Sequence, residues 1–182
     1  NRILLGLFSD DGLVVLEPCL IRDLGAAVIR RELEAAPETS RRLRAAGEEL
    51  TQLGLEAPLD GRRMVHVFHI GDQRRARVQF YADFCILGGD RVDRRELVWH
   101  LEEHPDRFSP DAALRPIVQG AVLPVIAYVA GPSEVAYHAQ LKELYEFFDV
   151  PMPVVYPRAG VTLLEAGVAR AIDRFGLSAA QL

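Results

Sequence analysis

Two short apolar segments, residues 125–130 and 154–156, are separated by about one helix worth of chain. Between them, apolar positions recur at helical spacing and predict a helix at 133–148 with its charged side chains on the opposite side. A strand, a crossover helix and a second strand form a β-α-β unit, in which the strands lie parallel. The pattern therefore predicts a parallel core in residues 93–182.

The first 60 residues are predicted to contribute to the same core through a helical connection. A continuous apolar run at 13–16 indicates a strand covered on both faces. Helical periodicity follows at 20–36, where Pro37 is expected to end the helix, and a more charged helix is expected at 38–53.

Residues 61–92 show a different pattern of apolar and polar positions. Alternating, β-rich segments occur at 64–70, 78–81 and 84–87, and they are separated by glycine-containing turns. This pattern predicts a small antiparallel meander inserted into the parallel core. The fold class expected from the whole pattern is α/β, with a Rossmann-like parallel core and a small antiparallel β insertion.

Helix-start signals follow the insertion. Asp93 and Glu96 have the spacing of a capping box and predict a helix that ends near Pro105. Ser109-Pro110-Asp111 resembles a second helix start. Pro116 predicts a break at Arg115, which exposes it toward the edge of the sheet, followed by a new helix at 116–123. A final helix is expected at 163–175, ended by Gly176.

Composition narrows the possible functions. The 182 residues include 21 Lys+Arg and 26 Asp+Glu, and the net charge of -5 argues against a broad nucleic-acid-binding face. No apolar run approaches 18 residues, so no membrane span is expected. Cys19 and Cys85 lie far apart in sequence, and we expect both to be buried in a protein of the reducing cytoplasm.

The turn Gly131-Pro132 lies where a ligand would bind. Gly131 permits a sharp turn and close approach of the backbone, and Pro132 suits the first position of a helix. Ligands of open parallel sheets bind outside the carboxyl ends of strands, beside helix N-termini. A plain turn and a ligand-binding loop both remain open from the pattern alone.

Two arginines adjoin prolines near this turn. Arg115 precedes Pro116, and Arg158 follows the second strand. Guanidinium groups bind carboxylates and phosphates bidentately, so these residues form either structural ion pairs or ligand contacts. Glu134 either favours the helix start by its charge or binds a substrate amine or hydroxyl. Neutral hydrogen-bonding groups are available at Gln119, Tyr137 and Gln140.

Other motifs are weaker. His69-Ile70-Gly71-Asp72 is similar to a histidine signature of nucleotidylyl-transferring enzymes, but it falls in a predicted hairpin turn and ends in Asp. The basic run at 74–77 is interpreted as a solvated strand edge, with an anion contact as the alternative. The sequence contains no residue cluster at metal-ligand spacing, so no metal is expected.

A longer motif carries a family resemblance. Residues 107–158 read RFSPDAALRPIVQGAVLPVIAYVAGPSEVAYHAQLKELYEFFDVPMPVVYPR, and TLLE follows at 162–165. This run resembles the core of the BshC family, the cysteine-adding enzymes of bacillithiol biosynthesis, and weaker similarity covers nearly the whole chain. Members are far longer, so the resemblance implies that this sequence is a fragment.

The resemblance implies a cytoplasmic ligase with a core similar to class I nucleotidylyltransferases. Such an enzyme joins cysteine to glucosaminyl-malate through an amide bond, with ATP as a possible cofactor and a homodimer formed through a C-terminal coiled coil. It also implies that the catalytic residues lie in a missing N-terminal part, so that the fragment alone is inactive.

The site that this resemblance favours is built around the glycine turn. The anionic substrate is assigned to Arg115 and Arg158, and the turn at Gly131 is expected to supply backbone N–H groups. Orientation of the sugar or amine is assigned to Glu134, Tyr137 and Gln140, and Gln119 is counted among the substrate-binding residues. The alternatives are a noncatalytic ligand-binding domain and a nucleotide-sugar enzyme that shares only the core.

Overall fold

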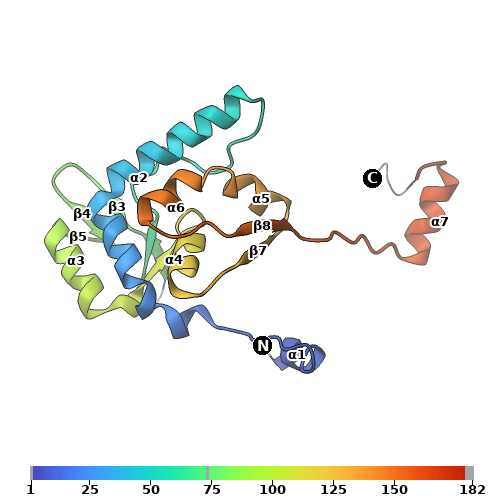
Figure 1. The fold of residues 1–182 in the computed structure, drawn as a ribbon, viewed down its shortest axis with the longest axis horizontal. Coiled ribbons are helices and arrows are strands. Elements are labelled where there is room, and N and C mark those ends of the chain that lie inside the picture. The colour runs from blue at the N-terminus through green and yellow to red at the C-terminus, as the bar shows by residue number, and fades with distance from the viewer. Residues whose placement is uncertain (1, 73, 179–182) are drawn as a thin grey trace.

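The computed structural model describes residues 2–72 and 74–178. The body of the protein is arranged around the long helix α2 (Ala26–Gln52), which contacts three further helices and one of the small sheets (Figure 1). Large side chains buried between these elements include Phe108, Leu97 and Ile117, which form one continuous apolar core. Helix α7 (Ala166–Arg174) lies apart from this body, at the end of an extended segment.

The predicted β-α-β unit is present. Strand β7 (Ala127–Ala130) pairs in parallel with β8 (Val154–Pro157), with Ala127 opposite Val154 and Ala130 opposite Pro157. Helix α5 (Pro132–His138), which begins the crossover, contacts both strands and covers one face of the pair. On the other face, side chains such as Val129 and Tyr156 are exposed. The carboxyl ends of both strands therefore lie side by side.

The single crossover helix predicted at 133–148 is wrong. The segment forms two helices, α5 and α6 (Lys142–Phe148). At the break, the N–H of Gln140 donates to the carbonyl of Tyr137 and the N–H of Leu141 to that of His138, so the turn tightens to a three-residue spacing. Asp149, with φ of 56°, then ends α6 in the left-handed conformation.

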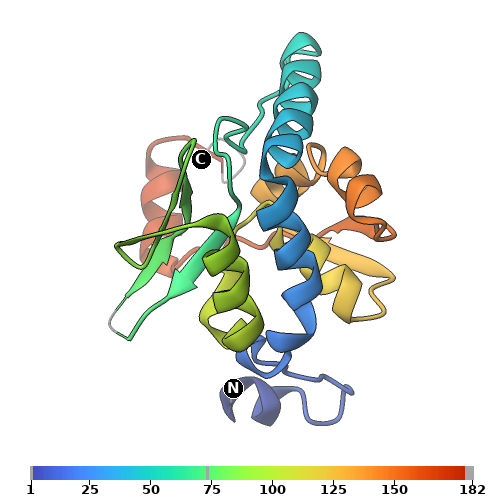
Figure 2. The same ribbon diagram turned by 90° about the vertical axis from the view of Figure 1, so that its left-hand side faces the viewer.

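The antiparallel strands of the insertion form two three-stranded sheets in the described part of the chain, rather than one meander. The first sheet has the order β2 (Arg75–Arg77), β1 (Val67–Ile70), β6 (Phe108–Pro110). The second has the order β3 (Gln79–Phe80), β4 (Cys85–Leu87), β5 (Asp90–Val92). Strand β6 lies outside residues 61–92, so the first sheet joins the insertion to the core (Figure 2).

The N-terminal predictions need correction. Helix α1 (Arg2–Leu7) is followed by residues 13–16, which form no strand and are largely exposed, Val14 at 82%. Two short 3₁₀ helices, η1 (Pro18–Ile21) and η2 (Asp23–Gly25), then lead into α2. Cys85 is buried as predicted, but Cys19 is exposed in η1.

Pro37 does not end a helix as predicted. Helix α2 continues through it, with a local kink at Ala35, where φ is -118° and ψ is 21°. The kink relieves the clash between the proline ring and the preceding turn. Buried side chains on both sides of the kink, Leu33 and Leu43, keep the two halves on the core.

The helix-start signals were partly correct. Helix α3 (Arg94–Glu103) begins as predicted, with the N–H of Glu96 donating to Asp93 Oδ1 over 2.8 Å, and η3 (Pro105–Arg107) follows it. The prediction that Ser109-Pro110 starts a helix is wrong, because these residues pair in β6. Helix α4 (Arg115–Val122) begins instead at Arg115, within the region of the predicted break. No helix of the described residues is both long and apolar enough to cross a membrane.

Candidate functional site

The paired strand ends bring Gly131 and Arg158 together. The N–H of Arg158 donates to the carbonyl of Ala130 over 2.8 Å, which continues the pairing of β7 and β8 by one residue. The Arg158 guanidinium lies directly against the glycine turn: a Cβ atom on Gly131 would be 2.9 Å from Arg158 Nη2. Glycine thus lets the end of the arginine side chain approach the turn closely, and a larger residue would make that side chain shift.

Glu134 occupies the start of α5. The N–H of Gly131 donates to Glu134 Oε2 over 2.9 Å, and Tyr128 Oη donates to Oε1 over 3.3 Å. The hydrogen bond from Gly131 lowers the pKa of Glu134, and the positive charges of Arg158 and Arg115 lower it further. Glu134 thus stabilises the helix start and is also influenced by the positive charges of Arg115 and Arg158, the two arginines predicted to bind the anion.

This contact changes one expectation. The N–H of Gly131 was expected to be available to an anion, but the Glu134 carboxylate already accepts it. Helix α5 has only seven residues, and Pro132 contributes no N–H. In this conformation, side-chain guanidinium groups are better anion donors at the turn than its backbone.

Arg115 interacts with Glu134 and with two tyrosines. Partial desolvation opposes the charge of Arg115, but Tyr137, Tyr128 and Glu134 outweigh it and raise the pKa of the guanidinium. Burial and the neighbouring Tyr137 raise the pKa of Tyr128. The buried Tyr137 hydroxyl makes no hydrogen bond to a described residue, although it lies close enough to influence both neighbours. The hydroxyl is enclosed beside Arg115 and Tyr128, so a ligand reaches it only if one of these side chains moves.

The two glutamines have different surroundings. Gln119 lies on α4, one turn after Arg115, and both residues line a cavity of about 700 Å³. Gln140 is fully buried at the break between α5 and α6. Its Oε1 accepts from the N–H of Leu59 over 2.8 Å, and its Nε2 donates to the carbonyl of Leu59 over 3.3 Å. Gln140 thus fastens the loop before the insertion to the crossover, and we leave it outside the proposed site.

Tyr128 was missed by the sequence analysis. Its side chain faces the helix-covered side of β7, as do those of Ala130 and Val155, whereas Val129 faces outward. The alternation of the strand, with a phenolic hydroxyl two residues before the end, was the signal that could have identified it. The tetrapeptide that begins at His69 lies in the β1–β2 hairpin, as interpreted from the sequence.

A second cluster of polar side chains lies between α2 and the first sheet. The side chain of Asp111 is almost buried, and its Oδ2 is 3.0 Å from His66 Nδ1 and accepts from Arg77 Nη1 over 2.9 Å. Burial of Asp111 opposes ionisation, but His66 and Arg77 more than compensate and lower its pKa to about 2. Glu32 is also fully buried; it accepts the N–H of His66, and burial raises its pKa. These charges join α2 to the first sheet.

Together, the parallel β-α-β unit, Arg158 at the end of β8 and Arg115 at the start of α4 are features of a Rossmann-like α/β domain. The comparisons identify the family. Residues 1–159 match the family model described as "Bacillithiol biosynthesis BshC, N-terminal Rossmann-like domain". The chain belongs to the BshC family, and the predicted Rossmann-like fold class is confirmed.

Similar curated proteins are named "Putative cysteine ligase BshC". The protein from Salinibacter ruber is 36% identical over 98% of this chain and 34% of its own length. Those from Chloroherpeton thalassium and Prosthecochloris aestuarii are 33% and 38% identical, over 94% and 95% of this chain. The chain therefore spans about a third of the length of these relatives.

Proposed function

We propose that this chain is the substrate-binding part of a cysteine ligase of bacillithiol biosynthesis, which joins cysteine to glucosaminyl-malate through an amide bond. Membership of the BshC family supports the reaction class. The observation that carries the assignment of the site is the position of Arg115 and Arg158. Their charges act on Glu134 from two different segments, and neither forms an ion pair with a described residue.

In this proposal the two guanidinium groups bind the malate carboxylates. Bidentate contacts of this kind fix both the position and the orientation of an anionic substrate. The Tyr137 hydroxyl then hydrogen-bonds to the sugar, and Glu134 sets the orientation of the arginines by its charge. Holding the malyl group in place positions the sugar amine for attack on the cysteine carboxyl group, which lowers the entropic cost of the reaction.

The described residues do not assign a place to ATP, the cofactor that the family resemblance suggests. The glycine turn at Gly131 donates its N–H to Glu134, and the histidine of the β1–β2 hairpin does not precede a helix. The proposed role of this chain therefore includes no step that uses a nucleotide. A homodimer and a cytoplasmic location remain predictions for the longer protein.

The proposal is tested by substituting Arg115→Ala in a full-length enzyme and measuring formation of the thiol product. Loss of a charge-assisted contact is worth roughly 1.5–3 kcal/mol, so kcat/KM should fall about 10- to 100-fold, chiefly through KM.

The matched control is Arg91→Ala, which removes an exposed arginine stacked 3.9 Å above Phe84, outside the site, and should leave kinetics unchanged. Unchanged turnover of the Arg115→Ala enzyme would remove that residue from the site. Ligand binding without turnover by the wild-type protein would favour a noncatalytic binding domain instead.

A further inference from the structure

The cavity next to α4 combines a mostly apolar wall with charged side chains that are all positive. Its volume of about 700 Å³ is in the range of small-molecule sites. Side chains such as Val14, Ile29 and Leu123 form the apolar wall. Arginines reach it from three separate parts of the chain: Arg22 from the segment before η2, Arg75 from β2 and Arg115 from α4. None of the described residues that line the cavity is acidic.

The arginines of this cavity have only neutral hydrogen-bond acceptors. Arg22 Nη1 donates to the carbonyl of Asp106 over 2.6 Å. Arg75 Nε donates to Ser109 Oγ over 3.0 Å, and its Nη2 donates to the carbonyl of Pro110 over 3.1 Å. In the described part of the chain, no ion pair involves Arg22, Arg75 or Arg115. These contacts hold Arg22 and Arg75 in place without an acidic partner, whereas Glu134 partly compensates the charge of Arg115.

The groups also repel one another. Partial desolvation lowers the pKa of Arg75, and the charges of Arg77, Arg22 and Arg115 lower it further. Asp111 acts in the opposite direction, but its Oδ2 is already bound by His66 and Arg77. Positive charges that converge without a counter-ion raise the energy of the folded protein, and a bound anion would recover that energy.

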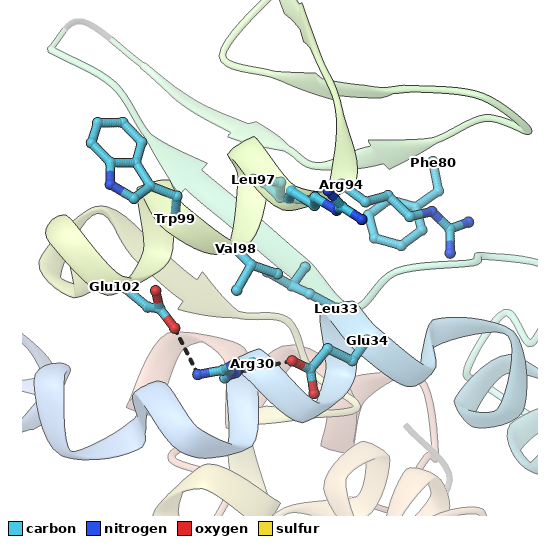
Figure 3. Close-up of a pocket in the computed structure, with 10 residues that line it drawn as sticks. Arg30, Leu33, Glu34, Phe80, Arg94, Leu97, Val98, Trp99 and Glu102 are labelled. Carbon is cyan, nitrogen blue, oxygen red and sulfur yellow. Dashed lines mark hydrogen bonds and ion pairs between the residues drawn. The ribbon is translucent and has the colours of Figure 1, made fainter.

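In a groove between α2 and α3, by contrast, an arginine is paired with acidic side chains. There Arg30 lies between two carboxylates, with Nε 2.9 Å from Glu34 and Nη1 2.6 Å from Glu102 (Figure 3). Arg94 and Trp99 line the same groove, and Arg94 stacks on Phe80. Because Arg30 already has two acidic partners, no bound anion is needed to neutralise its charge.

We propose that the cavity lined by Arg22, Arg75, Arg115 and Gln119 binds a small organic dianion, through carboxylate or phosphate groups, with its carbon skeleton on the apolar wall. Guanidinium forks match both anionic groups, and the Gln119 amide can hydrogen-bond to a neutral oxygen of the ligand. Arg115 also belongs to the proposed malate site, whereas Arg22 and Arg75 do not, and neither Gly131 nor Arg158 lines this cavity. The Arg22 and Arg75 variants therefore test binding in this cavity separately from cysteine ligation.

The test is calorimetric titration of the 182-residue chain at two salt concentrations. Succinate serves as the dicarboxylate probe, inorganic phosphate as the phosphate probe and acetate as the monoanion control. We expect saturable binding of succinate, phosphate or both, weak binding of acetate, and lower affinity at the higher salt concentration. The relative affinities of the two dianions identify the preferred group.

Variants locate the binding. Arg22→Gln and Arg75→Gln should each weaken dianion binding about tenfold or more, because each removes a charge-assisted contact. Arg91→Gln, the matched control outside the cavity, should retain wild-type affinity. If Arg75→Gln unfolds, as circular dichroism would show, Arg22→Gln and Arg75→Lys carry the test. Absence of saturable dianion binding, or binding that is insensitive to the Arg22 and Arg75 substitutions, would overturn the proposal.

Discussion

Individual buried charges connect distant segments of this protein. The contact between His66 and Asp111 joins residues 45 positions apart, and that between Glu32 and the His66 backbone joins residues 34 apart. Sequence periodicity cannot show such pairs, because each residue looks like an ordinary polar position in its own segment. Asp111 was predicted to lie in the first turn of a helix, but it accepts the N–H of Ala113 in the turn before α4, and its Oδ2 contacts His66 and Arg77.

The pKa of Asp111 predicts a change of stability in acid. The folded-state pKa of about 2 lies below the ordinary value of 3.8. The stabilisation is therefore fully present above about pH 4 and is lost as pH falls through 2, amounting to about 2 kcal/mol in the free energy of unfolding. Glu32, whose pKa is raised, contributes with the opposite sign.

The measurement is urea unfolding between pH 2 and pH 7. Asp111→Asn should be less stable than the wild type by about 3 kcal/mol at pH 7, because it leaves buried partners uncompensated, and should lose less stability in acid. Asp83→Asn, at an exposed turn position, should unfold like the wild type at pH 7. An Asp111→Asn variant with wild-type stability and wild-type acid dependence would refute this account of the cluster.

At the scale of elements, the apolar pattern predicted the type of most segments but not their ends. The β-α-β unit, the antiparallel strands and α3 follow from local periodicity and capping. The division of α5 from α6 does not, because it depends on the contact of Gln140 with Leu59, 81 residues earlier. Likewise, α2 continues past Pro37 because buried residues on both sides hold it to the core.

The contact at the helix break predicts a structural role for Gln140. Gln140→Met conserves volume but leaves the N–H and carbonyl of Leu59 without partners, which should lower the free energy of unfolding by about 2–3 kcal/mol. In a full-length enzyme that still folds, the KM values should be unchanged. The matched control Gln119→Met, at a half-buried position, should change stability by less than about 0.5 kcal/mol. A raised KM with unchanged stability would instead support the substrate-orienting role that the sequence suggested for Gln140.

At the scale of the whole molecule, apolar surfaces remain uncovered by the described residues. Val129, Val154 and Tyr156 expose 59%, 65% and 63% of their surface on the open face of the β7–β8 pair. The apolar run at 13–16, which the sequence suggested as a strand buried on both faces, is also exposed. A local pattern can identify an apolar segment but not the element that covers it. The curated relatives are about three times as long as this chain, so the proposed reaction belongs to a longer protein.

The placement of the site could be predicted only in part. The parallel strands and the glycine turn implied that Gly131 and Arg158 would meet, and the structure brings them into contact. Glu134, Tyr137 and Arg115 also gather there. The use of the Gly131 N–H by Glu134, and the arginines of the α4 cavity, depend on side-chain positions that spacing does not specify.

The most direct test of the central claim compares two substrates in two full-length enzymes. The kcat/KM for cysteine addition is measured with glucosaminyl-malate and with an analogue that lacks the malate carboxylates, in the wild type and in Arg158→Gln. If Arg158 binds those carboxylates, removing them should cost the wild type about 10- to 100-fold and the variant much less, because the two losses remove the same contact. Equal losses in both enzymes would show that Arg158 does not bind the malyl group and would contradict the proposed site.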